Sequence, residues 1–337
     1  MKATINDVAK QAGVSIKTVS RVMNNEPSVR QATREKVMTA VTELNYQPNL
    51  AARNLAGTKA YSIAFVYDNP NAYYVIDMQN GILNACKQQG FELVIHPCSA
   101  KSPTILDEIT TMIKHSRIAG IVLTPPFSEN PEFVQHLISL DIDVVRIISG
   151  DEAPDELAPC VMVNDREAAY SITQHLIDLG HKDIGFIAGE KHHKSTVERL
   201  NGYKQALEEN NLAVNEQLIV EGEYSFDSGV SGAKQLMSES SKPTAIFSCN
   251  DEIAAGALFA SRLMGIAIPE QLSITGFENS PFSRQTWPKL TTANQPNSNI
   301  AENAANLLIA KTRKQSAQHV ETNYTPQLIV RDSTQQA

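Results

Sequence analysis

Three short segments at the start of the chain place apolar residues at the spacing of an amphipathic helix. The first covers residues 4–12, the second residues 15–24 and the third residues 32–44. Thr4 and Ser15 stand where a side-chain hydroxyl would cap the first two helices, and Gly13 supplies the left-handed residue that ends the first. The pattern therefore predicts a helix-turn-helix followed by a third helix. The apolar stripes consist of Ile5, Val8, Ala9 and Ala12 in the first segment, of Val19, Val22 and Met23 in the second, and of Val37, Ala40, Val41 and Leu44 in the third.

After residue 60 the pattern changes to short apolar runs that alternate with helical segments. Runs this apolar are typical of strands that are buried on both faces of a parallel sheet. They fall into two consecutive series, which predict two doubly wound α/β lobes with a cleft between them. The strands of the first series cover residues 62–67, 91–96, 118–124 and 143–148, and those of the second cover residues 183–189, 218–222, 245–249 and 273–277.

Charge is divided unevenly between the helical start and the α/β remainder. The 337 residues carry a net charge of −8. Residues 1–60 hold nine Lys and Arg against four Asp and Glu, which is a net charge of +5 and leaves −13 for the remainder. A basic head on an acidic body is typical of a DNA-binding domain attached to a regulatory one.

The cysteines and the N-terminal residues indicate a cytoplasmic protein. Cys86, Cys98, Cys160 and Cys249 are far apart and lack CxxC spacing, which favours free thiols in a reducing compartment. The N-terminal residues lack the apolar core of a signal peptide, and no apolar run approaches the ~20 residues that span a bilayer. We therefore expect a cytoplasmic location at the nucleoid and no membrane partner.

The second helix carries polar side chains opposite its apolar stripe, and its surroundings match a known family. Lys17, Thr18, Ser20 and Arg21 suit phosphates and base edges. The run TINDVAKQAGVSIKTVSRVMNN, then TREKVMTAVTELNYQPN and LAARNLAG, resembles the LacI/GalR (lactose-repressor) family of bacterial transcription regulators without a gap over residues 4–57. Further segments resemble the same family in order: HLIDLGHKDIGFIAG, RLNGYKQAL, AIFSCNDEIAAGAL, PEQLSITGFEN, PKLTTANQP and LIVRDST.

The resemblance implies three domains. These are an all-α helix-turn-helix headpiece at residues 1–46, a hinge helix and linker at 47–60, and an α/β core at 61–337. The core is expected to have two doubly wound lobes, like a periplasmic binding protein. The first lobe is expected at about 61–161 and 291–320, and the second at about 162–290 and 321–332. The core is also expected to form a homodimer, and no leucine heptad follows LIVRDST to join four chains.

The resemblance also implies how the head would bind DNA. The partner is a near-palindromic double-stranded operator with two half-sites. Ile16, Lys17 and Arg21 would face base edges, while Thr4, Ser15, Thr18, Ser20 and Asn24 are better suited to phosphates. In the hinge, which includes Asn49, the small residue Ala52 would permit close approach and Leu55 would open a base step in the minor groove. The alternative for the hinge is a plain linker helix.

Candidates for a small-molecule site follow strands and match family positions. Ligands of open α/β sheets bind beyond the carboxyl ends of the strands. The alternative for Arg199 is an interdomain salt bridge, and the alternative for Tyr224 is a place in the core. Tyr73 and Tyr74 are both candidates for the region that follows the first strand. The expected effector-binding residues are Tyr73, Tyr74, Arg146, Ser195, Arg199, Tyr224, Asn250 and Glu278.

Two positions depart from the pattern of the family. Glu278 stands where many relatives carry Asp, and Ile148 stands where a strand often carries Asp. Arg146 projects from the same face as Ile148, two residues earlier. Compared with the pattern of the family, this chain lacks one carboxylate and has one additional guanidinium. We therefore hypothesise that the effector carries a phosphate, a carboxylate or an acetylated amine. Arg146 could instead pair with Asp151 or Glu152.

These observations predict a repressor of a carbohydrate-utilisation operon that a sugar-derived effector releases. Phosphorylated, acidic and amino sugars are candidates for this effector. A corepressor-dependent regulator of the same family is the alternative, and a sugar-binding protein is a remote one. An enzyme is not expected, because the sequence contains no GxGxxG, no GxxxxGK[ST] and no HExxH. No cofactor and no metal ion are expected, since Cys and His do not cluster.

Overall fold

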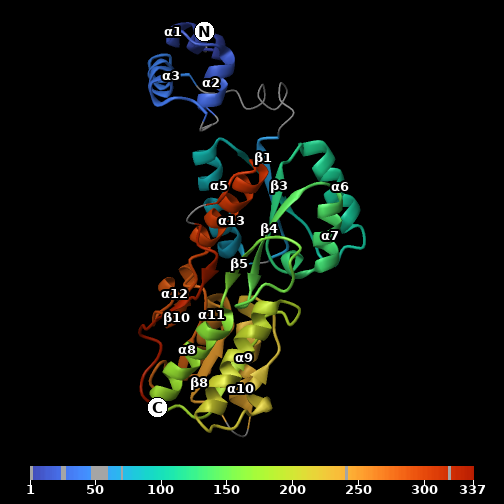
Figure 1. Cartoon of the computed structure of the whole chain (residues 1–337). Coiled ribbons are helices and arrows are strands. Elements are labelled where there is room, and N and C mark those ends of the chain that lie inside the picture. The colour runs from blue at the N-terminus through green and yellow to red at the C-terminus, as the bar shows by residue number, and fades with distance from the viewer. Residues whose placement is uncertain (1–2, 24–27, 47–59, 70, 240–241, 318–319) are drawn as a thin grey trace. The chain divides into compact units, whose positions relative to one another are not determined.

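The computed structural model describes residues 3–23, 28–46, 60–69, 71–239, 242–317 and 320–337 (Figure 1). Its contacts divide the chain into two units, Met1–Tyr61 and Ser62–Ala337, called here the head and the core. Among the predicted DNA-binding residues, Asn24, Asn49, Ala52 and Leu55 lie outside the described residues. Within the described ranges, no helix is both long and apolar enough to cross a membrane.

The head is a three-helix unit whose turns follow from its capping residues. Helices α1 (Ile5–Ala12), α2 (Ile16–Met23) and α3 (Gln31–Glu43) pack around Val8, Val19 and Val37. Thr4 and Asp7 form a reciprocal capping box at the start of α1. Gly13 ends this helix at a φ of +64°, a conformation that side chains with a Cβ rarely adopt. The predicted helix-turn-helix is confirmed.

The first lobe of the core is a parallel sheet between two pairs of helices. Helices α5 (Ala72–Gln89) and α13 (Asn297–Thr312) cover one face, and α6 (Ile105–Ser116) and α7 (Pro131–Ser139) cover the other (Figure 1). The strand order is β11-β5-β4-β3-β1-β2. Its strands are β1 (Ser62–Tyr67), β2 (Glu92–Pro97), β3 (Gly120–Leu123), β4 (Asp143–Ser149), β5 (Cys160–Val163) and β11 (Asn323–Tyr324).

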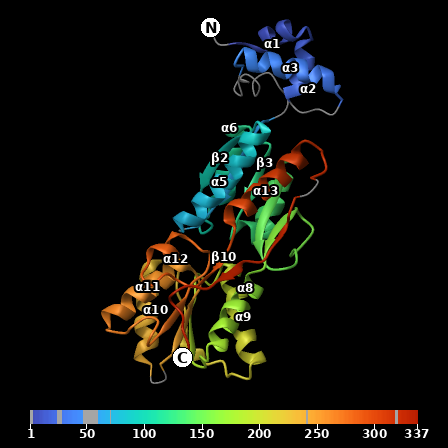
Figure 2. The same cartoon turned by 90° about the vertical axis from the view of Figure 1, so that its left-hand side faces the viewer.

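The second lobe repeats this plan with a four-stranded parallel sheet in the order β7-β6-β8-β9. Helices α8 (Asp165–Asp178) and α9 (Lys194–Glu209) pack against each other, and so do α10 (Phe226–Ser238) and α11 (Asp251–Leu263) (Figure 2). The strands are β6 (Ile184–Ile187), β7 (Ile219–Val220), β8 (Ala245–Ser248) and β9 (Ser273–Thr275). Two doubly wound lobes were predicted, and this fold class is confirmed.

Three segments connect the lobes, and the last of them differs from the prediction. The chain passes from β5 into α8, then through α12 (Pro281–Gln285) and β10 (Thr292–Asn294) to α13, and finally from β11 to β12 (Gln327–Ile329). Residues 322–332 were expected to pair with the second lobe. The start of this segment differs, since β11 extends the first sheet. The later part agrees, since β12 pairs with β10, whose segment accepts the N–H groups of Gly276 and Glu278 of the second lobe. The free edge of β5 explains this difference, because Met162 and Asn164 donate backbone N–H groups to residues 322 and 324.

Candidate functional site

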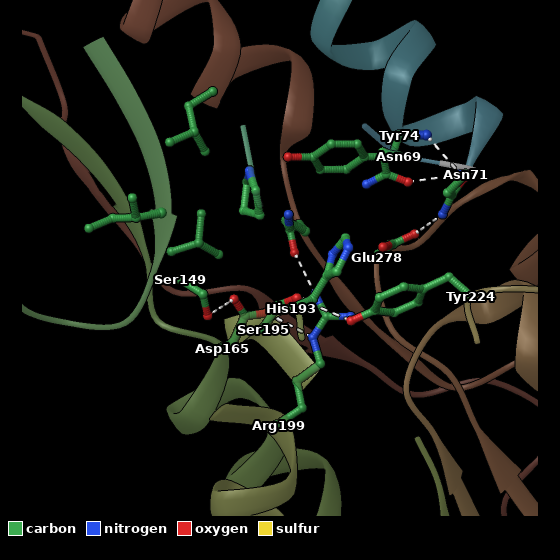
Figure 3. Close-up of a pocket in the computed structure, with 15 residues that line it drawn as sticks. Asn69, Asn71, Tyr74, Ser149, Asp165, His193, Ser195, Arg199, Tyr224 and Glu278 are labelled. Atoms are coloured by element: carbon green, nitrogen blue, oxygen red, sulfur yellow. Dashed lines mark hydrogen bonds and ion pairs between the residues drawn. The ribbon is translucent and has the colours of Figure 1, made fainter. Parts of the chain in front are cut away.

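A pocket lies between the two lobes of the core, where strands of both sheets end (Figure 3). Tyr74, Asn69 and Asn71 come from the first lobe and face Arg199 and Ser195 of the second. The position agrees with the rule that open α/β sheets bind ligands beyond the carboxyl ends of their strands. The lining residues are Asn69, Asn71, Tyr74, Pro125, Ile147, Ile148, Ser149, Val163, Asp165, His193, Ser195, Arg199, Tyr224, Glu278 and Gln295.

The guanidinium of Arg199 is held on all sides by the protein. Its Nε donates to Asp165 Oδ1 at 2.8 Å, and its Nη1 donates to the carbonyl of Cys249 at 2.6 Å. Its Nη2 donates to Gln295 Oε1 at 3.3 Å, and its plane lies 3.7 Å from the ring centroid of Phe277. Arg199 thus lines the pocket, as predicted, and also forms a buried ion pair, with a partner inside its own lobe.

Hydrogen bonds cross the pocket from one lobe to the other. Ser149 Oγ, at the end of β4, donates to Asp165 Oδ2 of α8 at 2.6 Å. Asn71 Nδ2, which belongs to the N-cap residue of α5, donates to Glu278 Oε2 at 2.7 Å (Figure 3). Glu278 adopts a φ of +96°, a costly conformation for a residue with a side chain. The strained backbone at Glu278 therefore holds a carboxyl group that joins the two lobes.

The environment of Glu278 favours its protonated form. Burial raises the pKa of this carboxyl to about 8, with Arg199 and the Asn71 amide opposing the shift and Asp251 adding to it. Burial likewise raises the pKa of Glu129 and of Asp251 to about 7. The folded core therefore binds protons at neutral pH that ordinary carboxyl groups release.

The thermal stability of the core is expected to fall as pH rises from about 5 to 8 and to level off above that. The pKa of Glu278 in the fold lies above its ordinary value of 4.5, so the folded state binds more protons than the unfolded chain in this range. Each pH unit over which the fold keeps one proton that the unfolded chain has released costs up to about 1.4 kcal/mol, roughly 2–4 °C in Tm. Calorimetry across this pH range measures the slope.

The control for this pH dependence is the Glu278→Gln variant, which keeps the size of the side chain and removes its titration. The Tm of this variant is expected to fall less steeply with pH than that of the unaltered protein. Equal slopes in the two proteins would show that Glu278 does not titrate with a raised pKa.

Tyr224 is both part of the core and part of the pocket wall. Its hydroxyl lies 2.7 Å from Thr196 Oγ1 and 3.1 Å from Ser195 Oγ, so hydrogen bonds tie it to the start of α9. The ring packs so closely on Gly189 that a Cβ there would lie 2.5 Å from it. This close approach accounts for the glycine that ends the motif HLIDLGHKDIGFIAG.

Three of the predicted effector-binding residues do not line the pocket. Arg146 is fully buried and forms a bidentate ion pair with Asp155, at 3.0 and 2.7 Å, and not with Asp151 or Glu152. Asn250 is the N-cap of α11 and accepts the N–H of Ile253 at 2.8 Å. Tyr73 is not among the lining residues and lies edge-on to Phe282, with ring centroids 5.5 Å apart. The structure therefore does not bring these three side chains together with the other predicted residues in this pocket.

Several lining residues were missed by the sequence analysis. Asn69 and Asn71 follow β1, and Asp165 follows β5, so the rule of strand ends could have found them. Gln295 lies in the segment PKLTTANQP, which was recognised as resembling the family but not as part of the site. The residues that were not predicted as effector contacts are Asn69, Asn71, Pro125, Ile147, Ile148, Ser149, Val163, Asp165, His193 and Gln295.

The head offers a separate polar surface on α2. The side chain of Ile16 is 50% exposed, and Lys17 and Arg21 are exposed as well, while Val19 and Val22 face the head core. Ser15 caps the helix by accepting the N–H of Thr18 at 3.1 Å. The three residues predicted to face base edges are thus accessible together on one short helix.

Comparison with known proteins decides the family. Residues 4–49 match the model described as bacterial regulatory proteins, lacI family, and residues 173–334 match a periplasmic binding protein-like domain. The chain is 31% identical over 331 residues to the HTH-type transcriptional repressor PurR of Vibrio vulnificus, covering 98% of both chains. The chain belongs to the LacI family. It is also similar to the catabolite control protein A of Priestia megaterium, at 32% identity over 317 residues and 94% of both chains.

Solved structures of LacI-family proteins agree with this fold. A complex of the regulator CelR with cellobiose matches with a TM-score of 0.73 and 27% identity, over 98% of this chain and all of that one. A lac repressor dimer bound to operator and an anti-inducer matches with a TM-score of 0.72 and 26% identity, over 99% and 100%. This LacI-family protein is therefore a DNA-binding transcriptional regulator with an effector-binding domain. Its named relatives are transcriptional regulators, and within the described residues no three His, Cys, Asp or Glu side chains are placed to hold a metal ion.

Proposed function

We propose that this LacI-family protein represses a carbohydrate-utilisation operon and leaves its operator when a sugar-derived effector occupies the pocket. The observation that carries the proposal is the pocket itself, which both lobes line with hydrogen-bonding side chains. A ligand that contacts both lobes shifts their relative orientation, and such a shift can be coupled to the DNA-binding head. Two relatives support a sugar: one is named the ribose operon repressor of Haemophilus influenzae, and the CelR structure contains cellobiose. In this proposal the protein acts as a regulator and not as an enzyme.

The charges of the pocket favour a neutral or amino sugar over an anionic one. Its lining contains the carboxyl groups of Asp165 and Glu278, and the guanidinium of Arg199 is already engaged by Asp165 and Gln295. Arg146, on which the hypothesis of an anionic effector depended, is paired with Asp155. An anion would therefore find no unengaged guanidinium among these lining residues, whereas sugar hydroxyls or an ammonium group would find carboxyl oxygens as acceptors. Tyr74, Ser195, Arg199, Tyr224 and Glu278 remain as proposed effector contacts.

The proposed DNA partner is a near-palindromic operator that two heads of a homodimer bind. Ile16, Lys17 and Arg21 are the proposed base contacts. The homodimer is supported by apolar side chains on one side of the first lobe, where Ile76 of α5 is 48% exposed and Ile95 of the edge strand β2 is 46% exposed. Exposed apolar groups on adjacent elements are typical of subunit interfaces. Because the target is chromosomal DNA, this proposal places the protein in the cytoplasm.

The test is fluorescence anisotropy of the purified protein on DNA from upstream of its own gene, at fixed salt. Neutral sugars, amino sugars, sugar phosphates and purines are then titrated into the complex. We expect binding that survives nonspecific competitor DNA and is lost with one neutral or amino sugar. Strengthened binding would instead make the protein a corepressor-dependent regulator. Binding that competitor DNA abolishes would contradict the proposed function.

A further inference from the structure

Helix α9 carries much of the second-lobe wall of the pocket. Its N-cap residue is His193, and Ser195 and Arg199 lie in its first two turns. All three side chains line the pocket (Figure 3). The exact placement of the start of α9 therefore decides how these residues face the first lobe.

The start of α9 lacks the side-chain cap that neighbouring helices have. Helices α5, α8, α10 and α11 each begin at a Ser or Asn whose side chain accepts a backbone N–H of the first turn. His193 makes no such bond in α9. Its ring is buried in the pocket wall, 5.6 Å from the ring of Tyr224 and 3.4 Å from a carboxylate oxygen of Glu190. His193 therefore lines the pocket and does not cap the helix.

A carboxylate from the first lobe accepts a hydrogen bond at the N-terminus of α9 instead. Glu129 ends a short 3-10 helix, Phe127–Glu129, that follows β3 in the first lobe. Its Oε1 accepts the N–H of Ser149 at 3.2 Å, within the first lobe. Its Oε2 accepts the N–H of Lys194, the first residue of α9, at 3.3 Å. A negative group at a helix N-terminus is favourable because it satisfies an unpaired N–H and faces the positive end of the helix dipole.

We propose that Glu129 is a positioning residue of the pocket: its carboxylate, anchored in the first lobe, caps α9 of the second lobe and so holds His193, Ser195 and Arg199 in register with the opposite wall. The cap forms when the lobes are close together, and the helix end is left uncapped when they separate. The proposal rests on the proposed function for its importance to DNA release, but the cap itself can be tested without an effector.

Two N–H donors and the charge of Lys194 favour the ionised form of Glu129, while burial and Asp165 oppose it. Burial raises the pKa of its carboxyl to about 7, while the N–H groups of Ser149 and Lys194 and the charge of Lys194 act against the shift. Asp165 is the other acid that faces it. A carboxyl group in such surroundings depends on its few hydrogen-bond donors, so it has little freedom to turn away from α9.

Hydrogen exchange of the full-length protein, followed by mass spectrometry, tests the cap. In Glu129→Ala, amides in the first turn of α9, from residue 195 to 198, are expected to exchange about ten-fold faster. Amides in the later half of α9 are expected to be unchanged. Glu132→Gln is the matched control, because Glu132 is an exposed acid in the first turn of α7 in the same lobe. A rise at all α9 amides alike would show general loss of stability and would overturn the proposal.

Lys194 allows a second, more specific test. Proline is tolerated at the first position of a helix and lacks the N–H that Glu129 accepts. Lys194→Pro should therefore speed exchange as Glu129→Ala does, whereas Lys194→Ala, which keeps the N–H, should have a clearly smaller effect. Combining Glu129→Ala with Lys194→Pro should add little to either change. Additive effects, or equal effects of Lys194→Pro and Lys194→Ala, would contradict the cap.

Anisotropy on the upstream DNA separates this inference from the proposed function. If the unaltered protein fails to bind DNA specifically, the proposed function fails whatever the exchange data show. If it binds DNA normally and Glu129→Ala leaves exchange in α9 unchanged, the cap is wrong and the proposed function stands.

Discussion

Replacing Arg199 with methionine is expected to lower the free energy of unfolding of the core by about 3–5 kcal/mol. Methionine keeps much of the volume of the side chain but removes every donor, which leaves the carboxylate of Asp165 buried and without its cation. Asp165 would keep the hydroxyl of Ser149 as a donor. The carbonyl of Cys249 and the amide oxygen of Gln295 would also lose their donor. Chemical unfolding monitored by circular dichroism measures the loss.

The same two helices provide a matched control. Arg166 of α8 pairs with Glu198 of α9 at 2.8 Å, but about half of the Arg166 side chain is exposed. Arg166→Met removes the same charge from a pair whose arginine is half exposed and whose Glu198 side chain is 12% exposed, and its cost is expected to be clearly smaller than that of Arg199→Met. Adding Asp165→Asn to Arg199→Met should restore part of the lost stability, because it removes the unpaired charge. Equal losses in Arg199→Met and Arg166→Met would show that burial of the pair is unimportant.

The periodicity of the sequence predicts most of this architecture. Strand β1 was expected at residues 62–67 and is found there, and β4 differs from its prediction by one residue. Both strands are runs of mostly apolar residues, so the local sequence is enough to predict that they are buried strands. The cap at Thr4 and the turn at Gly13 are local devices, and both occur as predicted. Short-range signals were therefore reliable.

The pocket was predicted less completely, because several of its residues depend on partners far away in the sequence. Arg146 was assigned to the pocket by the alternation of β4, yet a loop brings Asp155 within reach of its guanidinium. The spacing of residues in a strand gives the face of a side chain but not the carboxylate that will meet it. Asn250 follows a strand, as pocket residues do, but an Asn at that place can equally cap the next helix.

Glu129 was not predicted for the same reason. It stands in the segment PPFSEN, which carries no motif, and its partner Lys194 is 65 positions away in the other lobe. His193 is a poor N-cap, and the start of α9 at Lys194 was not predicted from the sequence. What caps α9 instead could be identified only once the lobes were seen together.

Replacing Arg21 with alanine is expected to weaken operator binding by a factor on the order of 100 to 1,000. An arginine that contacts guanine with two hydrogen bonds contributes about 1–3 kcal/mol, and a homodimer would lose this contact in both heads. Arg21 lies on the exposed face of α2, opposite Val19 and Val22, so the change leaves the head core intact. Anisotropy against a set of operators with single substitutions measures affinity and specificity together. The variant should discriminate poorly at one base pair of each half-site and normally at the others.

Lys36→Ala is the control for this loss, since Lys36 is an exposed basic residue of the same head and lies on α3 instead of α2. Both variants remove one positive charge per head and so weaken the general attraction to phosphates alike. For Lys36→Ala we expect a small loss that is the same for every operator. A loss for Arg21→Ala that is equally small and equally uniform would place Arg21 at the phosphates, and base recognition would then depend on Ile16 and Lys17 at the start of α2.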